Sequence, residues 1–147
     1  MAEFQVRKLR AGDLAKGFFE ALENLSPVGE INRQDAENIL KRIDELPEYN
    51  VFVAVTDDGE VIGAGTLLVE QKFIRKMGKA GHIEDIVTRK GWEGKGIGSA
   101  IMHALEEEAK RQGCYKIILT TRSEKIAGWY KKFGYYTRGV ELRKDLA

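Results

Sequence analysis

The fold is decided by one stretch of the chain, Val87-Thr-Arg-Lys-Gly-Trp-Glu-Gly-Lys-Gly-Ile-Gly-Ser99. A strand-like segment, His82–Val87, ends at Val87, where this stretch begins, and a helical pattern begins at Ile97. The free N–H groups of a helix's first turn and the positive end of its dipole make an anion site, and glycines let a phosphate approach the backbone closely. These glycines are too closely spaced for a dinucleotide-binding fingerprint, and the Gly-Lys-Ser/Thr of a nucleotide P-loop is missing. The stretch therefore predicts an anion-binding loop of another class, with a glycine-rich turn that binds nothing as the alternative.

Apolar periodicity on both sides of this loop predicts a sheet flanked by helices. Alternation of apolar and polar residues predicts strands over residues 4–10, 49–55, 61–69, 82–87, 115–120 and 135–142. Spacings of three and four predict helices over residues 13–25, 32–46, 97–112 and 124–133, with Asp13 as the N-cap of the first. Antiparallel hairpins come first and a strand–helix–strand unit follows, so the predicted class is α/β (an α+β mixed sheet), with a mostly antiparallel central sheet.

The composition bounds the possible functions. The 147 residues fit a single domain, residues 1–147, and 43% apolar with 32% charged residues is typical of a globular protein. A net charge of +1 gives no general attraction to nucleic acid or anionic lipid, and no run of about 18 apolar residues could span a membrane. The lone Cys114 cannot form an internal disulfide, and His82 and His103 are too isolated for a metal centre. We therefore expect a cytoplasmic protein that uses no metal, binds no nucleic acid and does not enter a membrane.

Two groups of charged residues are candidates for binding a small polar substrate. Glu84 and Asp85 interrupt an otherwise apolar strand, where burial of an unpaired acid is costly. Adjacent strand residues point to opposite faces, so we expect one acid to meet the substrate and the other to be structural. A basic segment over residues 72–79 forms a local cluster of positive charge that could attract an anionic ligand to a nearly neutral protein. An exposed strand end and a solvated basic connection are the respective alternatives.

Several segments carry a resemblance to one family. Gly94-Lys-Gly-Ile-Gly98, between a strand and a helix, resembles the pyrophosphate loop of the GNAT superfamily of acyl-CoA N-acyltransferases, although Glu93 stands where that loop usually has arginine or glutamine. Further segments are similar to glucosamine-6-phosphate N-acetyltransferases, and together they cover nearly the whole chain: Asp13-Leu-Ala-Lys-Gly-Phe-Phe-Glu20, Glu70-Gln-Lys-Phe-Ile74, Gly81-His-Ile-Glu-Asp-Ile-Val87, Cys114-Tyr-Lys116 and Tyr130-Lys-Lys-Phe-Gly-Tyr135. The resemblance implies the GNAT fold, acetyl-CoA as co-substrate and a homodimer with sites near the subunit boundary.

The same resemblance implies roles for individual residues. It implies that acetyl-CoA is bound through Ile86, Val87, Thr88, Glu93, Gly94, Lys95, Gly96, Ile97, Gly98 and Ser99. It implies that the phosphosugar is bound through Lys72, Phe73, Ile74, Arg75, Glu84, Asp85, Tyr115, Lys116 and, from a neighbouring subunit, Arg143. The implied catalytic residues are Tyr130, Glu84 and Asp85. A phenol with an ordinary pKa near 10 is a suitable proton donor to a departing thiolate, and aromatic packing is the alternative for Tyr130.

The expected reaction is direct transfer of an acetyl group from acetyl-CoA to the amine of glucosamine 6-phosphate, without a covalent enzyme intermediate. Backbone N–H groups after Asp85 would polarise the thioester carbonyl. Two positions depart from the family pattern, which has an acid where this chain has Thr121 and an asparagine where it has Ile126. They leave open a GNAT enzyme for another small amine, or for a protein lysine or N-terminus. A sensor that binds acetyl-CoA without turnover is the remaining alternative.

Overall fold

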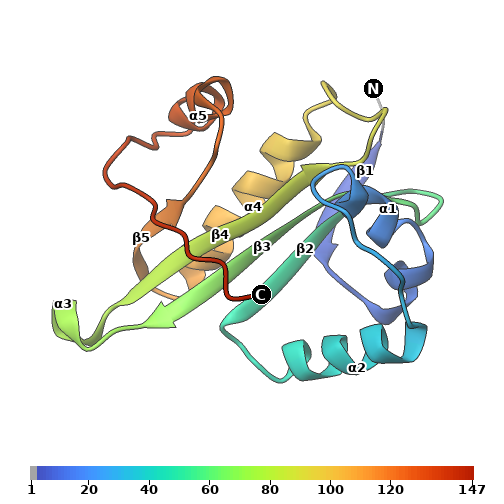
Figure 1. Ribbon diagram of the computed structural model, residues 1–147, viewed down its shortest axis with the longest axis horizontal. Coiled ribbons are helices and arrows are strands. Elements are labelled where there is room, and N and C mark those ends of the chain that lie inside the picture. Colours follow the sequence, from blue (N-terminus) through green and yellow to red (C-terminus); the bar gives the residue numbers. More distant parts are fainter. Residues whose placement is uncertain (1–2) are drawn as a thin grey trace.

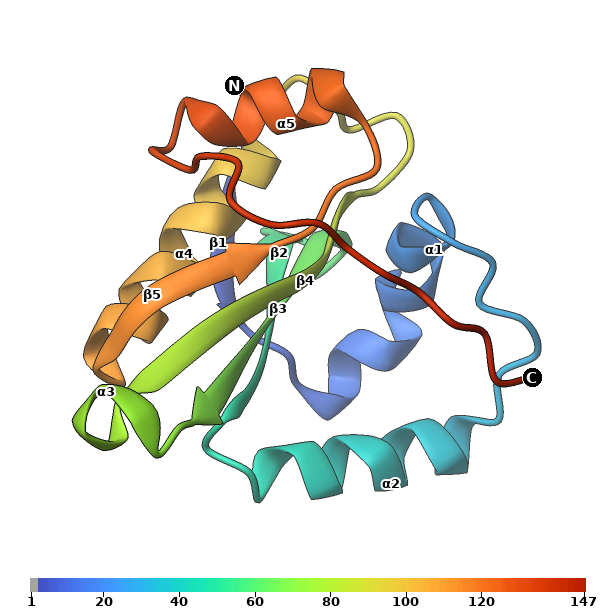
Figure 2. The same ribbon diagram turned by 60° about the vertical axis from the view of Figure 1, so that its left-hand side comes forward.

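The computed structural model describes residues 3–147, which form one five-stranded sheet with helices on both faces (Figure 1). The strands lie side by side in chain order: β1 (Phe4–Lys8), β2 (Tyr49–Thr56), β3 (Val61–Gln71), β4 (Lys79–Thr88) and β5 (Cys114–Leu119). β1 to β4 are antiparallel, and β5 is parallel to β4. One face is covered by α4 (Ile97–Arg111), and the other by η1 (Ala11–Ala15), α1 (Phe18–Glu23) and α2 (Arg33–Asp44) (Figure 2). The short α3 (Ile74–Met77) joins β3 to β4, and α5 (Glu124–Lys131) follows β5.

The predicted fold class and most of the predicted elements are confirmed. β1 to β5 and α2, α4 and α5 occupy the predicted segments, with ends that differ by a few residues. Asn32 caps α2, because its side-chain oxygen accepts the backbone N–H of Asp35 at 3.0 Å. β4 begins earlier than predicted, since its pairing with β5 already starts at Lys79.

The helix predicted over residues 13–25 is instead broken in two. Gly17 has a φ of +98°, which a right-handed helix cannot contain, so η1 precedes it and α1 follows it. Asp13 is therefore not an N-cap: it is buried, and its carboxylate accepts the Arg10 backbone N–H at 2.8 Å and the Arg7 guanidinium at 2.7 and 2.9 Å. Burial alone would raise the pKa of Asp13, but the hydrogen bonds from Arg7 and Arg10 outweigh it, and the pKa lies below its ordinary value. This ion pair fixes η1 against β1.

The strand predicted over residues 135–142 does not form. The chain after α5 runs as an extended segment towards the side of the sheet that carries α1 and α2 (Figures 1 and 2). Val140 and Leu142 are 88% and 91% exposed. A strand requires a neighbouring strand for its backbone hydrogen bonds, and none of the strands described over residues 3–147 pairs with this segment.

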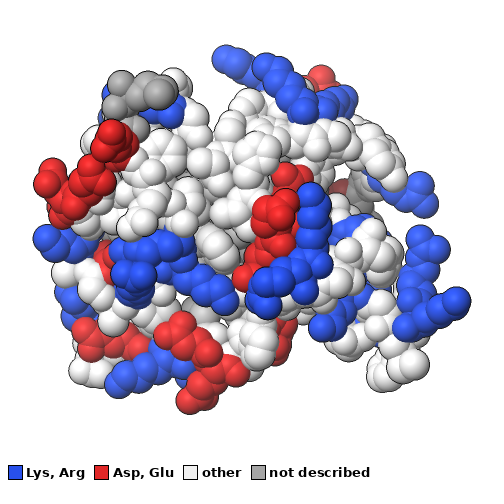
Figure 3. Space-filling view, turned by 180° about the vertical axis from the view of Figure 1, so that it is seen from behind, with Lys and Arg blue, Asp and Glu red and all other residues white. Residues whose placement is uncertain are grey.

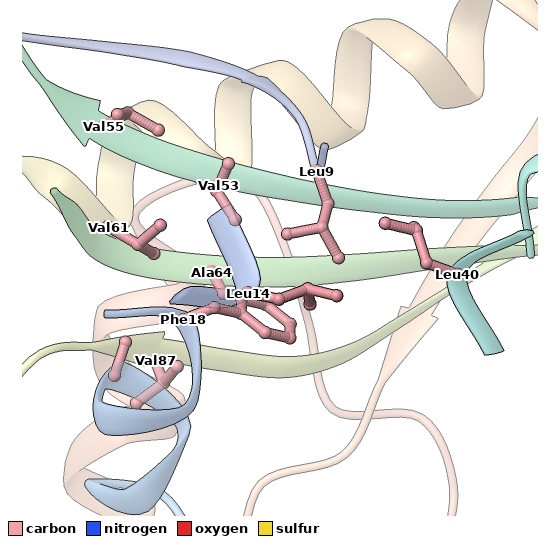
Figure 4. Packing of buried hydrophobic residues seen from close by; sticks show 10 residues of the cluster. Leu9, Leu14, Phe18, Leu40, Val53, Val55, Val61, Ala64 and Val87 are labelled. Carbon is pink, nitrogen blue, oxygen red and sulfur yellow. The ribbon is translucent and has the colours of Figure 1, made fainter. Parts of the chain in front are cut away.

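The hydrophobic core consists of two clusters, one on each face of the sheet. In the first, side chains from β2, β3 and β4 meet Leu14 of η1 and Phe18 of α1 (Figure 4). The second lies beneath α4, and its buried members are Ala54, Ile62, Leu67, Val69, Ile83, Ile97, Ile101, Met102, Leu105 and Ala109. Burial of large aliphatic side chains in both layers supplies the main stabilising contribution to the fold.

Two glycines of β3 bring α4 unusually close to the sheet. A Cβ built on Gly63 would lie 2.7 Å from Ile97 Cγ2, and one built on Gly65 would lie 2.7 Å from Ile101 Cγ2 and 2.6 Å from Ile86 Cδ1. Real side chains do not make contacts this short, so only glycine fits at either position. The N-terminal half of α4 thereby rests directly on β3 beside the end of β4.

The surface carries charges of both signs. Seen from behind, uncharged residues occupy much of the face, and groups of Lys and Arg lie beside groups of Asp and Glu at the left and in the centre (Figure 3), in keeping with the net charge of +1. Over residues 3–147, none of the helices is long and apolar enough to cross a membrane.

Gly65→Ala should lower the free energy of unfolding by about 1–3 kcal/mol, because the added methyl group overpacks the contact between β3, Ile86 and Ile101. Urea denaturation followed by circular dichroism measures this. Gly139→Ala is the matched control, since its Cβ would meet no atom of the described residues within 4 Å. Equal stabilities of the two variants would contradict the close approach of α4.

Candidate functional site

The sheet opens between β4 and β5. The two strands pair only as far as Ile83 and Leu119, and Glu84–Thr88 continues without a partner on that edge. Beyond Leu119 the chain leaves the sheet and enters α5 (Figure 1). The free backbone N–H and C=O groups along this part of β4 are available to a ligand that lies beside the strand.

A β-bulge at Asp85 changes the direction of the side chains on β4. Glu84 pairs with Thr66 and Val87 pairs with Ala64, so one residue of β3 faces two of β4, and Asp85 has a φ of +52°. Ile83 packs in the α4-side cluster, whereas Val87, four residues later, packs in the α1-side cluster. In a regular strand these two side chains would share a face.

The expectation that Glu84 and Asp85 point to opposite faces of the sheet is wrong, because of this bulge. Glu84 is directly opposite Thr66, and Thr66 and Asp85 line the same cavity on the α1 side of the sheet. Residues paired across strands point to the same face, so both carboxylates are directed to that side. The period-two expectation fails here because it assumed a strand without an inserted residue.

The cavity beside these acids has a volume of about 210 Å³ and lies between the sheet, α1 and α2. Most of its lining is apolar and comes from Leu9, Leu14, Phe18, Phe19, Leu22, Ala36, Ile39, Leu40, Ile43, Val51 and Ala64. Asp85, Thr66 and Tyr49 are its polar lining residues. An apolar pocket with a few polar groups is the usual form of a small-molecule site.

The loop before α4 has the geometry of an anion site. Gly94 and Gly96 have φ values of +76° and +80°, and a Cβ on either would meet no atom of the described residues within 4 Å. The N-terminus of α4 has no side-chain cap, so the N–H groups of its first turn remain available to an oxygen ligand. Lys95 adds a positive charge and lies 5.4 Å from the centre of the Trp92 ring. These features fit the pyrophosphate of acetyl-CoA.

Glu93 is turned back into the loop. Its carboxylate accepts the backbone N–H of Gly91 at 2.8 Å and the side-chain amide of Asn24 at 3.2 Å. Hydrogen bonds from backbone N–H groups, first that of Glu93 itself and then that of Gly91, lower its pKa. Asn24 also donates to the carbonyl of Thr88 at 2.7 Å. Sequence reasoning missed Asn24, because nothing near it in the chain indicates a contact 64 and 69 residues away.

Tyr130 lies near the end of α5, the helix that follows β5. Its ring packs edge-on against Trp129 and Tyr135, with centroids 4.9 and 6.2 Å apart. Trp129 in turn lies over Gly98, 3.5 Å from the position of a Cβ there, so α5 stands against the first turn of α4. Burial raises the pKa of Tyr130 above its ordinary value, so the phenol remains protonated at neutral pH.

The basic segment lies at the opposite end of β4 from the glycine loop (Figure 1). The Arg75 guanidinium is 5.1 Å from the centre of the Tyr115 ring and Lys116 Nζ is 5.6 Å from it, so these predicted substrate residues are adjacent to one another. Lys72 pairs with Glu70 at 3.1 Å, and the side chain of Phe73 is exposed. The ten residues of β4 span about 30 Å, so one chain does not bring this segment to the loop.

Arg143 and the two positions that depart from the family pattern, Thr121 and Ile126, are exposed or partly exposed. Arg143 is exposed and pairs with Asp145 at 2.7 Å. The Thr121 hydroxyl accepts the backbone N–H of Ser123 at 3.5 Å, and Ile126 is 49% exposed. Within residues 3–147, no group of three His, Cys, Asp or Glu side chains could hold a metal ion.

Comparison with known proteins agrees with this geometry. Residues 15–135 match the acetyltransferase (GNAT) family. The glucosamine 6-phosphate N-acetyltransferase of Candida albicans is 37% identical over 95% of this chain and 93% of its own length, and that of Arabidopsis thaliana is 33% identical over 98% of both. The crystal structure of the Arabidopsis thaliana glucosamine-6-phosphate N-acetyltransferase superposes with a TM-score of 0.93 at 31% identity, covering 99% of both chains.

The chain therefore belongs to the acetyltransferase (GNAT) family, and it is an acetyl-CoA-dependent N-acetyltransferase. Within the family, the chain belongs to the glucosamine 6-phosphate N-acetyltransferases, as its sequence resemblance predicted.

Proposed function

We propose that this protein transfers the acetyl group of acetyl-CoA to the amine of glucosamine 6-phosphate in the cytoplasm. The amine nitrogen forms a bond to the acetyl carbon, the carbon–sulfur bond breaks, and CoA leaves as a thiol beside N-acetylglucosamine 6-phosphate. The observation that carries the proposal is the open edge of β4, which has two carboxylates at its start and an anion-binding loop at its end. Similarity to the named enzymes over nearly the whole chain supports the choice of acceptor.

The proposed acetyl-CoA site follows β4 into α4. Backbone groups of Ile86, Val87 and Thr88 would hold the pantetheine arm, because this edge lacks a partner strand. The pyrophosphate would lie on the loop and first helical turn, formed by Glu93, Gly94, Lys95, Gly96, Ile97, Gly98 and Ser99. Backbone N–H groups beyond the bulge would polarise the thioester carbonyl, where oriented dipoles stabilise developing negative charge.

Glu84 and Asp85 are the proposed acceptor-side groups. Their position on one face, beside the cavity, lets both contact the same sugar, one through a hydroxyl and the other through the amine. The amine must lose a proton before or during attack, and a carboxylate on this face can receive it directly or through water. Tyr130 would then protonate the departing sulfur from the other side of the opening.

The proposed assembly is a homodimer. The basic residues Lys72, Arg75 and Lys116 lie around the start of β4, and Lys116 pairs with Ala80, four residues before Glu84. A second copy of the chain would add its own charged residues to the acids further along the strand. The extended segment after α5 favours such an assembly, since Val140-Glu-Leu-Arg143 alternates apolar with charged residues and the Val140 and Leu142 side chains are exposed. Arg143, in this segment, would reach the sugar phosphate of the neighbouring subunit.

A second acceptor has specific support. The cavity beside Asp85 is mainly apolar, and Thr121 stands where the resembled family has an acid. Both features favour a less polar amine than an amino-sugar phosphate, bound with the same co-substrate.

The acceptor is tested by mixing the purified protein with acetyl-CoA and following release of free thiol. We expect turnover with glucosamine 6-phosphate and little with unphosphorylated glucosamine, because the basic segment recognises the phosphate. Equal rates with both sugars would contradict a phosphate pocket. Bound acetyl-CoA without turnover of either sugar would move the assignment to the second acceptor class, to be identified with a panel of amines.

Tyr130→Phe should reduce kcat about a hundredfold, because the variant cannot donate a proton to the thiolate. In the unaltered enzyme the protonated phenol is the active form, so kcat should fall as the pH rises through its raised pKa, above the ordinary value of 10.0. The variant's residual kcat should lack this alkaline fall. Tyr136→Phe, a change at a 74% exposed ring, is the control. An unchanged profile in Tyr130→Phe would assign Tyr130 to packing alone.

Mixing two impaired variants tests the shared site. Arg143→Ala and Tyr130→Phe chains, unfolded together and refolded, should recover about one quarter of the full activity, because half of the dimers are mixed and each of these has one intact site. No recovery from a mixture that sediments as a dimer would place Arg143 outside the neighbouring site. A fully active monomer in sedimentation would contradict the assembly itself.

A further inference from the structure

The end of α1 is fastened to the glycine loop by one side chain. Asn24, the C-cap residue of α1, donates its amide to the Thr88 carbonyl at 2.7 Å and to the Glu93 carboxylate at 3.2 Å. Thr88 is the last residue of β4, and Glu93 begins the segment that leads into α4. The Asn24 amide therefore connects the two ends of the intervening turn, residues 89–92, and fixes them relative to each other. We call this set of hydrogen bonds, made by Asn24 and Glu93, the brace.

Glu93 completes this brace from inside the loop. One carboxylate oxygen accepts the Asn24 amide, and the other accepts the Gly91 N–H at 2.8 Å. Hydrogen bonds to a charged oxygen are stronger than neutral ones, so they hold the side chain in place even though it lies at the surface. The same bonds occupy a carboxylate that, if free to turn outward, would repel a phosphate at the N-terminus of α4.

Other contacts fix the start of the turn but not the glycine segment. Arg89 N–H donates to the Ile62 carbonyl at 2.8 Å, and its guanidinium pairs with Glu60 at 3.1 Å. Trp92 N–H donates to the Arg89 carbonyl at 2.9 Å. The glycines that follow have left-handed backbone angles and wide conformational freedom, so their position depends on how residue 93 is held.

We propose that Asn24 and Glu93 are positioning residues that hold the loop in the shape that receives the pyrophosphate of acetyl-CoA. They act through the backbone N–H groups of the loop and do not touch the reacting atoms. This inference rests on the proposed acetyl-CoA site. Its consequence is that the two side chains set the affinity for the co-substrate, while the rate of acetyl transfer within the bound complex depends on them much less.

Asn24→Ala tests the brace. Removing both hydrogen bonds of the amide should weaken CoA binding, measured by calorimetry, about tenfold, and should raise the KM for acetyl-CoA similarly. The KM for the acceptor and kcat should change much less, a split that general destabilisation would not produce. Asn38→Ala is the matched control, because Asn38 is an exposed helical asparagine whose hydrogen-bond partner, Gln34, lies on the same helix.

Changes at Glu93 separate bracing from charge repulsion. Glu93→Ala loses both acceptors and should weaken CoA binding about tenfold, whereas Glu93→Gln keeps an acceptor for the Gly91 N–H and should lie within about threefold of the unaltered protein.

Asn24→Asp places a second carboxylate against Glu93 and the Thr88 carbonyl and should bind CoA more weakly than Asn24→Ala. Combining Asn24→Asp with Glu93→Gln should recover part of that loss, since the new amide can donate to the new carboxylate. Glu107→Ala, at an exposed residue of α4, is the control.

Two results would overturn the inference. One is CoA binding within twofold of the unaltered protein in both Asn24→Ala and Glu93→Ala. The other is tighter binding by Glu93→Ala, which would identify Glu93 as a repulsive charge and not a brace. Failure of the unaltered protein to bind CoA would instead refute the proposed acetyl-CoA site on which the inference rests. Thermal unfolding of each variant confirms that the compared proteins are folded.

Discussion

The structure depends on one inserted residue in β4. Side chains alternate along a strand with a period of two, so the extra residue at Asp85 moves every later side chain to the other face. Ile83 and Ile86 consequently pack beneath α4, while Val87 packs beneath α1. The same insertion directs two neighbouring acids to one face and bends the strand at the point where β5 departs. Gly65, opposite the bulge, makes it possible, because any larger residue would occupy the space taken by Ile86.

The electrostatics of the co-substrate site are local. A chain with a net charge of +1 cannot attract a polyanion through its overall field, so attraction must come from α4, whose first-turn N–H groups are uncapped, and from Lys95. Glu93 adds an opposing charge in the same loop, in place of the arginine or glutamine of the resembled family. Its hydrogen bonds to Gly91 and Asn24 lower its pKa and direct its oxygens into the loop. The loop therefore gains rigidity from a residue whose charge alone would weaken binding.

Much of this architecture could be predicted from the sequence, because it depends on local patterns. Period-two and period-3.6 apolar spacing predicted five strands and the three longer helices, and the glycine stretch before Ile97 predicted the loop that leads into α4. The failures have physical causes. The bulge in β4 contains a residue with positive φ, Asp85, which no sequence signal marks, and the break at Gly17 depends on a backbone angle that an isolated glycine does not specify. Asn24 meets its partners only after the sheet has formed. The roles assigned to individual site residues remain predictions.

Two features of the structure favour assembly with a second copy of the chain. One is the spread of the predicted substrate residues along β4, and the other is the unpaired, strand-like segment at the end of the chain. The alternating pattern after Tyr135 is that of a strand with one apolar face, yet its apolar side chains are exposed. A segment with this pattern gains stability only when its backbone is paired and its apolar face is covered. The basic residues near Tyr115 form a cationic surface at the start of β4, about 30 Å from the glycine loop at its end, and Lys116 pairs with Ala80, four residues before Glu84. A second copy of the chain that pairs with this segment would cover its apolar side chains and would bring the partner's Arg143 towards the acids, and we therefore infer that the acceptor site is completed by assembly.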